Sequence, residues 1–299
     1  MSSCIVSTTS LWFPIKQRGL ASGILFACIG FGFSITVAGG NLLLGLGLNW
    51  TKSLAMLICV PGVIVTVLYA FTVKNVSDVY PGHYAIADLM PPEPESAGGI
   101  RVDTEKLPST MAEARKDKKV WALALTGFVN SWMILGFSAF LSHLLVYDLK
   151  VDSGLVATVM SLTFLVGAAG SIFGGVISDR VFKGYRYQTL MIGGILAAVG
   201  LLLLLVTRNN VLIIVFLILA YLGPNIVMGP VWACPASLVK PQIAGSVTAF
   251  ANVIANIGGL IVSPILGLTI DATGSAMMAL FFCVAMSILG TITARIMKV

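Results

Sequence analysis

The chain has 299 residues, of which 58% are hydrophobic and only 10% charged, and its mean hydropathy is +0.99. Soluble domains carry roughly 25% charged residues, so a water-soluble globule could not hide this much apolar surface. The apolar runs are unbroken and about 20 residues long, the length that a helix needs to cross a bilayer. The composition therefore predicts an all-α, polytopic membrane protein.

The net charge of +6 comes from Lys and Arg residues between the apolar runs. Lipid headgroups and membrane topology account for such residues, so the charge does not indicate a nucleic-acid partner. The five cysteines are scattered and form no CxxC pair, and we interpret them as small apolar residues. The sequence also has no P-loop, metal cluster or nucleophile elbow. We therefore expect no enzyme activity, metal or cofactor.

Eight apolar runs are long enough to be membrane spans. The first two lie at 19–48 and 53–73, and we predict a kink in the second at the Pro61-Gly62 pair. Residues 75–118 contain five prolines and most of the acidic residues, which predicts a linker that ends in a short amphipathic helix. The remaining six runs lie at 120–146, 154–177, 188–207, 211–234, 243–270 and 275–294.

The distribution of basic residues predicts the orientation of these spans. An even number of spans places both termini on one side of the membrane. If that side is the cytoplasm, the cytoplasmic segments hold all but three of the 18 Lys and Arg residues, the exceptions being Lys52, Lys150 and Arg208. Cytoplasmic segments are enriched in Lys and Arg, so we expect both termini and the linker to be cytoplasmic.

The segment GGVISDRVFKGYR, residues 174–186, is a charged stretch between two of the runs. One interpretation is a solvated loop that follows the charge bias, and the other is a tight turn that carries an ionic lock. In the second interpretation the carboxylate of Asp179 accepts hydrogen bonds from a neighbouring helix N-terminus and pairs with Arg180 or Arg186.

This segment resembles a cytoplasmic loop motif of the major facilitator superfamily, G-x-x-x-D-R/K-x-G-R-R/K. The matching residues are Gly175, Asp179, Arg180, Gly184 and Arg186, with two residues inserted before the second glycine. The resemblance implies that they form a gate that holds the cytoplasmic side closed in the outward-open state.

Two further stretches share this resemblance. Residues 12–24, WFPIKQRGLASGI, resemble the loop that enters the fifth helix of these transporters. Residues 229–267 resemble their tenth and eleventh helices, especially in the anion:cation symporter and related metabolite symporter branches. The long linker before a six-helix block also resembles their central cytoplasmic loop, so the resemblance covers nearly the whole chain.

Superfamily members have twelve helices in two halves, whereas only two runs precede the linker here. The resemblance implies that the chain corresponds to helices five to twelve and lacks the first four, as a fragment, a mis-started gene model or a reduced protein. Residues 1–18 would be the tail of a preceding helix and a cytoplasmic loop, and 19–74 two helices of an incomplete N-terminal half. The linker at 75–118 and a six-helix C-terminal half at 119–299 would follow.

The middles of the spans carry no Asp, Glu, Lys or Arg, so candidate substrate contacts are uncharged. Polar residues that share helix faces could line a hydrated cavity, or could join packed helices instead. The cavity candidates are Asn130, Tyr221, Asn225, Trp232, Asn252 and Asn256. Gly167, Gly170 and Gly174 form a small-residue face for which we predict helix packing.

These observations and the resemblance together predict a secondary active transporter in the plasma membrane. It would move a small anionic organic solute by alternating access, with a proton or a sodium ion as the coupled ion, and the chain alone could be an inactive fragment. The lipid bilayer is its other expected partner. The alternative is a non-transporting sensor, scaffold or remnant derived from a transporter.

Overall fold

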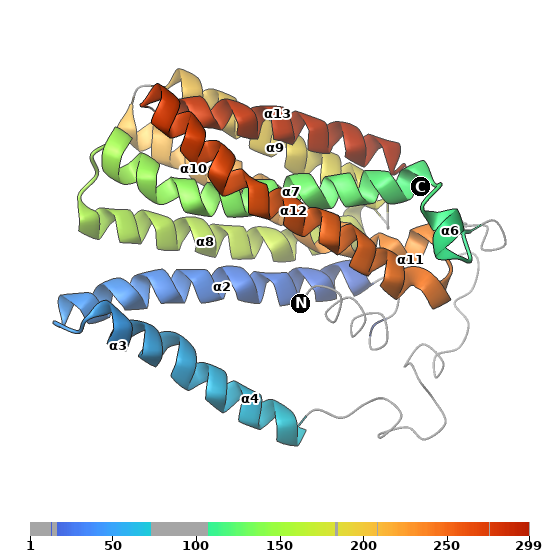
Figure 1. Ribbon diagram of the computed structural model, residues 1–299, viewed down its shortest axis with the longest axis horizontal. Coiled ribbons are helices and arrows are strands. Elements are labelled where there is room, and N and C mark those ends of the chain that lie inside the picture. The colour runs from blue at the N-terminus through green and yellow to red at the C-terminus, as the bar shows by residue number, and fades with distance from the viewer. Residues whose placement is uncertain are drawn as a thin grey trace.

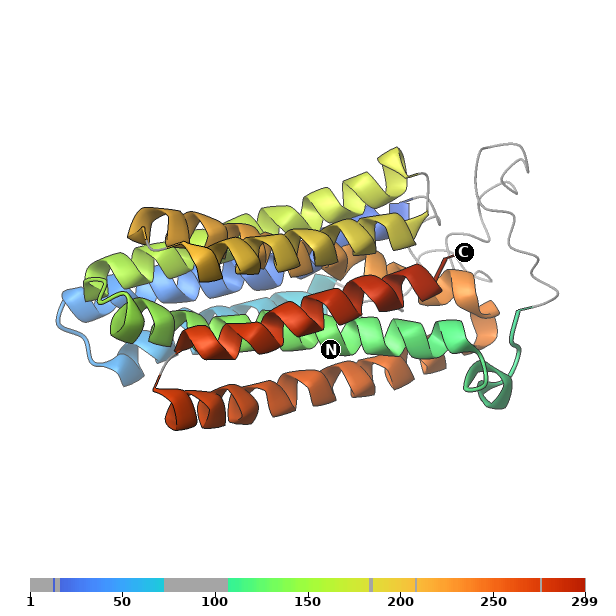
Figure 2. The same cartoon turned by 90° about the horizontal axis from the view of Figure 1, so that it is seen from above.

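A computed structural model of the protein describes residues 13, 17–72, 107–182, 185–207, 209–274 and 276–298. The regular elements in these ranges are all helices, and the long ones lie side by side in a bundle (Figure 1). Seen from above, the same helices remain close to parallel (Figure 2). The predicted linker falls mostly at residues 73–106, outside the described ranges.

The helices follow the apolar runs in chain order. They are α2 (Arg18–Gly45), α3 (Trp50–Leu54), α4 (Val60–Thr72), α6 (Met111–Ala114), α7 (Lys118–His143), α8 (Ser153–Val176), α9 (Arg186–Val206), α10 (Asn210–Ala233), α11 (Pro235–Leu238), α12 (Pro241–Thr273) and α13 (Ala276–Ile296). Wider π-helical segments join α3 to α4 at Ala55–Cys59 and extend α7 at Leu144–Asp148 and α8 at Ile177–Val181.

The helices confirm the predicted fold class. Among the described residues, seven helical spans, counted with their π-helical segments, are long and apolar enough to cross a membrane, and α13 contains a shorter apolar helix, Leu280–Ile296. Their bounds agree with the predicted runs to within a few residues. In the second span, the π-helical segment Ala55–Cys59 lies just before Pro61, the residue where we predicted a kink. Proline lacks an N–H and its ring clashes with the preceding turn, and a π-helical turn relieves both effects.

Helix α10 lies at the centre of the packing. It contacts α2, α7, α8 and α9, while α2 also packs along α8 and α12 packs along α7. Helix α13 covers α7 and α9. The interrupted helix Trp50–Thr72 diverges from the bundle (Figure 1). Its apolar side chains are therefore exposed, and Phe71 has an exposed fraction of 83%.

Glycines let α8 approach its neighbours at backbone distance. A Cβ atom at Gly174 would collide with the carbonyl oxygen of Ile226 in α10, and one at Gly23 of α2 would collide with the carbonyl oxygen of Ser171. Small residues at membrane helix contacts permit this proximity, which strengthens packing where no hydrophobic effect acts between helices. The predicted packing face of α8 meets α10 with Gly167 at Tyr221, Gly170 at Leu222 and Gly174 at Ile226.

Replacing Gly174 by alanine should lower the stability of the protein by about 1–3 kcal/mol, because the new methyl group meets backbone that cannot move aside. The matched control is Gly267→Ala in α12, where the methyl group would enter open space. That change should be neutral or stabilising by up to about 1 kcal/mol, since alanine favours helix. Thermal unfolding in detergent compares the two variants, and equal midpoints would contradict the packing argument.

Candidate functional site: the contact between α2 and α8

The first part of the charged segment is helical up to Val181, whereas our two interpretations were a solvated loop and a tight turn. The π-helical segment Ile177–Val181 extends α8 and carries Asp179 to the start of α2. There the backbone N–H of Leu20 donates a hydrogen bond to Oδ2 of Asp179, with 2.8 Å between the two atoms. The extension thus connects two helices whose contacting residues are 159 positions apart in the chain.

Asp179 supplies the cap that α2 lacks. The first N–H groups of a helix have no partner within the helix, and a Ser, Thr, Asp or Asn at the N-cap usually accepts from one of them. The N-cap residue of α2 is Gln17, whose side chain makes no such bond. A carboxylate from another helix takes this role, and the positive end of the α2 dipole favours its negative charge.

Two glycines make room for this contact. A Cβ atom at Gly19 would collide with the carboxylate of Asp179, and one at Gly175 would lie 2.5 Å from the carbonyl oxygen of Gly19. A side chain at either position would push the start of α2 away from α8. The motif glycine Gly175 therefore has a steric role next to the carboxylate.

Arg186, the first residue of α9, secures the end of α10. Its Nη1 donates to the carbonyl oxygen of Ala233, the last residue of α10, and to Oγ of Ser237 at 3.0 Å. The side chain is buried. Burial raises the pKa of Asp179, while the hydrogen bond from Leu20 and the positive charge of Arg186 oppose this shift. Of the two partners that we considered for Asp179, the buried Arg186 acts on it electrostatically and Arg180 is exposed. An ion pair of Asp179 with either residue stays a prediction. Gly184 lies outside the described residues.

The aromatic stripe of α10 is buried. The ring of Tyr221 packs against Phe137 of α7 and Phe164 of α8, with centroids 5.4 Å and 5.6 Å away. The side-chain amide of Asn225 donates to the carbonyl oxygen of Tyr221 at 2.8 Å, and Trp232 is only 3% exposed. In this conformation all three residues lie inside helix contacts, and their role in substrate binding stays a prediction.

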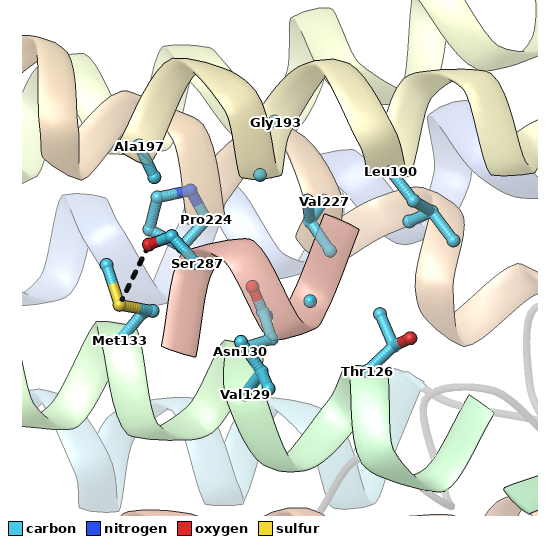
Figure 3. A pocket seen from close by; sticks show the side chains of 12 residues that line it. Thr126, Val129, Asn130, Met133, Leu190, Gly193, Ala197, Pro224, Val227 and Ser287 are labelled. Carbon is cyan, nitrogen blue, oxygen red and sulfur yellow. Dashed lines mark hydrogen bonds between the residues drawn. The ribbon is translucent and has the colours of Figure 1, made fainter. Parts of the chain in front are cut away.

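Asn130 of α7 lines a small cavity between α7, α9, α10 and α13 (Figure 3). Its Nδ2 donates to the thioether sulfur of Met228 at 3.0 Å, which links α7 to α10. Thr126 and Ser287 add hydroxyl groups to the cavity wall, and the space holds little more than a single water molecule. Such a cavity is too small for an organic anion in the present conformation.

Asn252 and Asn256 lie on α12, away from the cavity. Asn252 is half-buried and Asn256 is exposed, and the Nδ2 of Asn256 donates to the backbone carbonyl oxygen of Asn252 at 2.8 Å. The six cavity candidates thus occupy three separate places: the α8–α10 contact and its continuation along α10, the cavity beside α7, and the open face of α12. Within the described ranges, no group of His, Cys, Asp or Glu is placed to hold a metal ion.

Sequence reasoning missed the partners of the gate residues. The backbone of α2 at Gly19 and Leu20 and the carbonyl of Ala233 carry no side-chain signal of their own role. One signal was available, because a helix that begins at Arg18 after Gln17 has no capping residue and so needs an acceptor from elsewhere. The cavity residue Thr126 could also have been found, since it lies four positions before Asn130 on one helix face.

The sequence comparisons agree with this architecture. The family model described as Major Facilitator Superfamily matches residues 1–263. The chain is 23% identical over 271 residues to the probable sulfoacetate transporter of Cupriavidus necator, covering 88% of this chain and 61% of the relative. It is 26% identical over 286 residues to the probable galactarate/D-glucarate transporter of Escherichia coli K12, covering 91% and 63%. The chain therefore spans less than two thirds of the length of these relatives.

Solved structures share the fold. The Escherichia coli fucose:proton symporter superposes with a TM-score of 0.54 at 13% identity, covering 98% of this chain and 90% of that one. A peptide transporter in complex with sulfate also gives 0.54, at 20% identity, covering 60% of this chain and 37% of that one. The family match extends over most of the chain, and the helical fold agrees with it. The chain belongs to the Major Facilitator Superfamily.

Proposed function

We propose that the protein works as a secondary active transporter that moves a small organic acid anion across the plasma membrane by alternating access. The observation that carries the proposal is the hydrogen bond from Leu20 to Asp179. It joins the start of α2, which precedes the linker in sequence, to the end of α8, which follows the linker. In alternating access two halves rock about a central site, and such a contact holds one face closed.

The gate has the energy scale of a contact that opens and closes. A hydrogen bond to a charged group contributes roughly 1.5–3 kcal/mol, which thermal motion and substrate binding can offset. Beside the hydrogen bond, Gly19 and Gly175 contribute backbone to the contact, so no side chain of these two residues has to move when the start of α2 separates from α8. Asp179 is therefore proposed to stabilise the state that is closed to the cytoplasm.

The substrate class follows from the relatives. Their names specify sulfoacetate, galactarate/D-glucarate and, for a Bacillus subtilis protein 25% identical over 294 residues, hexuronate. All are small organic acids, ionised at neutral pH. We extend this class, but no single member, to the present chain. We propose that Asn130 and Asn225, whose amides donate to Met228 and Tyr221 in the present conformation, become donors to the solute in another one. The coupled ion is proposed to be a proton or sodium.

Proteoliposomes that contain the protein should accumulate at least one radiolabelled acid from a panel of glucarate, galactarate, glucuronate and sulfoacetate. Neutral fucose serves as the control, and it should not accumulate, because the proposal requires an anion. Imposing a pH gradient or a sodium gradient in separate samples identifies the coupled ion. If no acid is accumulated or bound by a correctly inserted protein, the non-transporting sensor or scaffold becomes the better interpretation.

Replacing Asp179 by asparagine should reduce the transport rate roughly 10-fold or more while membrane insertion remains normal, since the charge that favours the α2 N-terminus is lost. Asp271→Asn is the matched control, because this exposed carboxylate lies at the end of α12 and takes no part in the gate. Initial uptake rates per inserted molecule compare the variants. An Asp179→Asn protein that transports at the normal rate would refute the gate.

A further inference from the structure

The last part of the linker is a fixed structure attached to the six-helix block. We call residues 107–121 the clasp. Its one-turn helix α6 has a capping box in which the N–H of Glu113 donates to Oγ1 of Thr110 at 3.3 Å. The backbone N–H of Lys240 donates to the carbonyl oxygen of Pro108 at 3.1 Å, and Ala114 is buried in the core cluster beside Leu238. The clasp is therefore held against the ends of α11 and α12.

The acidic groups of the clasp are used within it. The carboxylate of Glu113 accepts from the backbone N–H of Ser109 at 2.8 Å and from its hydroxyl at 3.1 Å, and these bonds lower the pKa of Glu113. Asp117 caps α7 by accepting from the N–H of Lys119 at 2.8 Å. Both carboxylates are thus committed to backbone or hydroxyl donors close in sequence.

The basic groups of the clasp lie outward. Arg115, Lys116 and Lys118 are exposed and Lys119 is half-exposed. Two of these lysines stand in the first turn of α7, where the helix dipole disfavours positive charge, so helix stability does not explain them. The nearby chain adds further positive charge: Lys240 acts electrostatically on Glu113, and α13 brings Arg295 and Lys298 to the same end of the bundle (Figure 1).

An aromatic pair, Trp121 and Phe250, lies next to Arg115. Trp121 is 44% exposed, and its indole N–H donates to the carbonyl oxygen of Arg115 at 2.8 Å. Its ring meets Phe250 of α12 edge to face, 5.4 Å between centroids, and the guanidinium of Arg115 lies 5.7 Å from the Phe250 centroid. Exposed tryptophans with one polar contact are typical of the membrane–water interface. The aromatic pair thus places the clasp at headgroup level.

We propose that the clasp is a binding surface for anionic phospholipid headgroups on the predicted cytoplasmic side. Arg115, Lys116, Lys118 and Lys119 provide donors for the phosphate oxygens, while Trp121 and Phe250 contact the upper acyl chain. The charge bias of cytoplasmic segments would be met by basic residues anywhere in the linker. The folded clasp goes further, because it holds four of them within residues 115–119, and one of them, Arg115, contacts the aromatic pair.

The experiment measures which lipid surrounds Trp121. Trp12 and Trp50 are replaced by phenylalanine. Of the three tryptophans that remain, Trp121 is exposed, whereas Trp132 and Trp232 are at most 3% exposed. The protein is reconstituted in mixed phosphatidylglycerol and phosphatidylcholine vesicles in which one lipid carries brominated chains. Quenching by each brominated lipid gives the relative association of the two lipids. Phosphatidylglycerol should be favoured at least about 5-fold, the effect of one basic contact near the surface.

Replacing Arg115, Lys116, Lys118 and Lys119 together by glutamine should return the ratio to about 1, the value for no preference. In the control variant, exposed Lys52 and Lys150 on the predicted non-cytoplasmic side are replaced by glutamine. This variant should keep the preference for phosphatidylglycerol. Equal quenching by the two lipids in the parent, or a preference that survives in the fourfold variant, would overturn the proposal.

Salt provides a test that does not depend on folding of the variant. Raising KCl should weaken the preference in the parent protein, because exposed charges are screened, and a salt-independent preference contradicts the proposal. Sodium phosphate at equal ionic strength should displace the lipid no better than KCl. Stronger displacement by phosphate would show a site for free phosphate in place of a lipid surface. None of these readouts depends on transport, so the result stands apart from the proposed function.

Discussion

Two helix ends in this bundle are completed by charged side chains from other helices, and the arrangement of four helices depends on them. The start of α2 receives the carboxylate of Asp179 from the end of α8, and the end of α10 receives the guanidinium of Arg186 from the start of α9. Backbone groups without partners are costly where water is scarce. These two residues therefore set how far α2 and α10 extend and where they meet their neighbours.

The spans could be predicted from sequence because lipid permits few alternatives. An apolar run of sufficient length in a bilayer has to be a helix, and the predicted runs match the helices closely. The capping role of Asp179 could be stated in kind, since a carboxylate at a cytoplasmic helix end seeks N–H donors. The identity of the donor could not, because Leu20 is brought there only by the packing of α2 along α8.

The candidate site was harder to predict for a related reason. Helical periodicity shows that Tyr221, Asn225 and Trp232 share a face of α10, but not what this face meets. In a soluble protein the apolar face would mark the core, whereas in a membrane both lipid and core are apolar. The structure shows that the face meets glycines of α8 at one end and lies near Gly127 of α7 at the other. Only the three-dimensional arrangement separates such contacts from a cavity wall.

Proline and glycine act as a pair at the contact of α8 with α10. Pro230 has no N–H to donate to the carbonyl of Ile226, four positions earlier, yet α10 continues through it. That carbonyl meets Gly174, where the absence of a side chain lets the Cα–H of α8 approach it. Backbone contact of this kind ties α8 to α10 closely.

The contact between α2 and these two helices has a different character. Gly229 of α10 and Gly175 of α8 both approach the backbone of α2 near Gly19, and a Cβ atom at Gly229 would lie 3.0 Å from the Gly19 carbonyl oxygen. Backbone meets backbone near Gly19. The hydrogen bond from Leu20 to Asp179 is the polar contact between α8 and the start of α2. In the proposed transport cycle α8 and α10 therefore move together. The start of α2 is the element proposed to part from them, because the polar contact that holds it there is a single charged hydrogen bond.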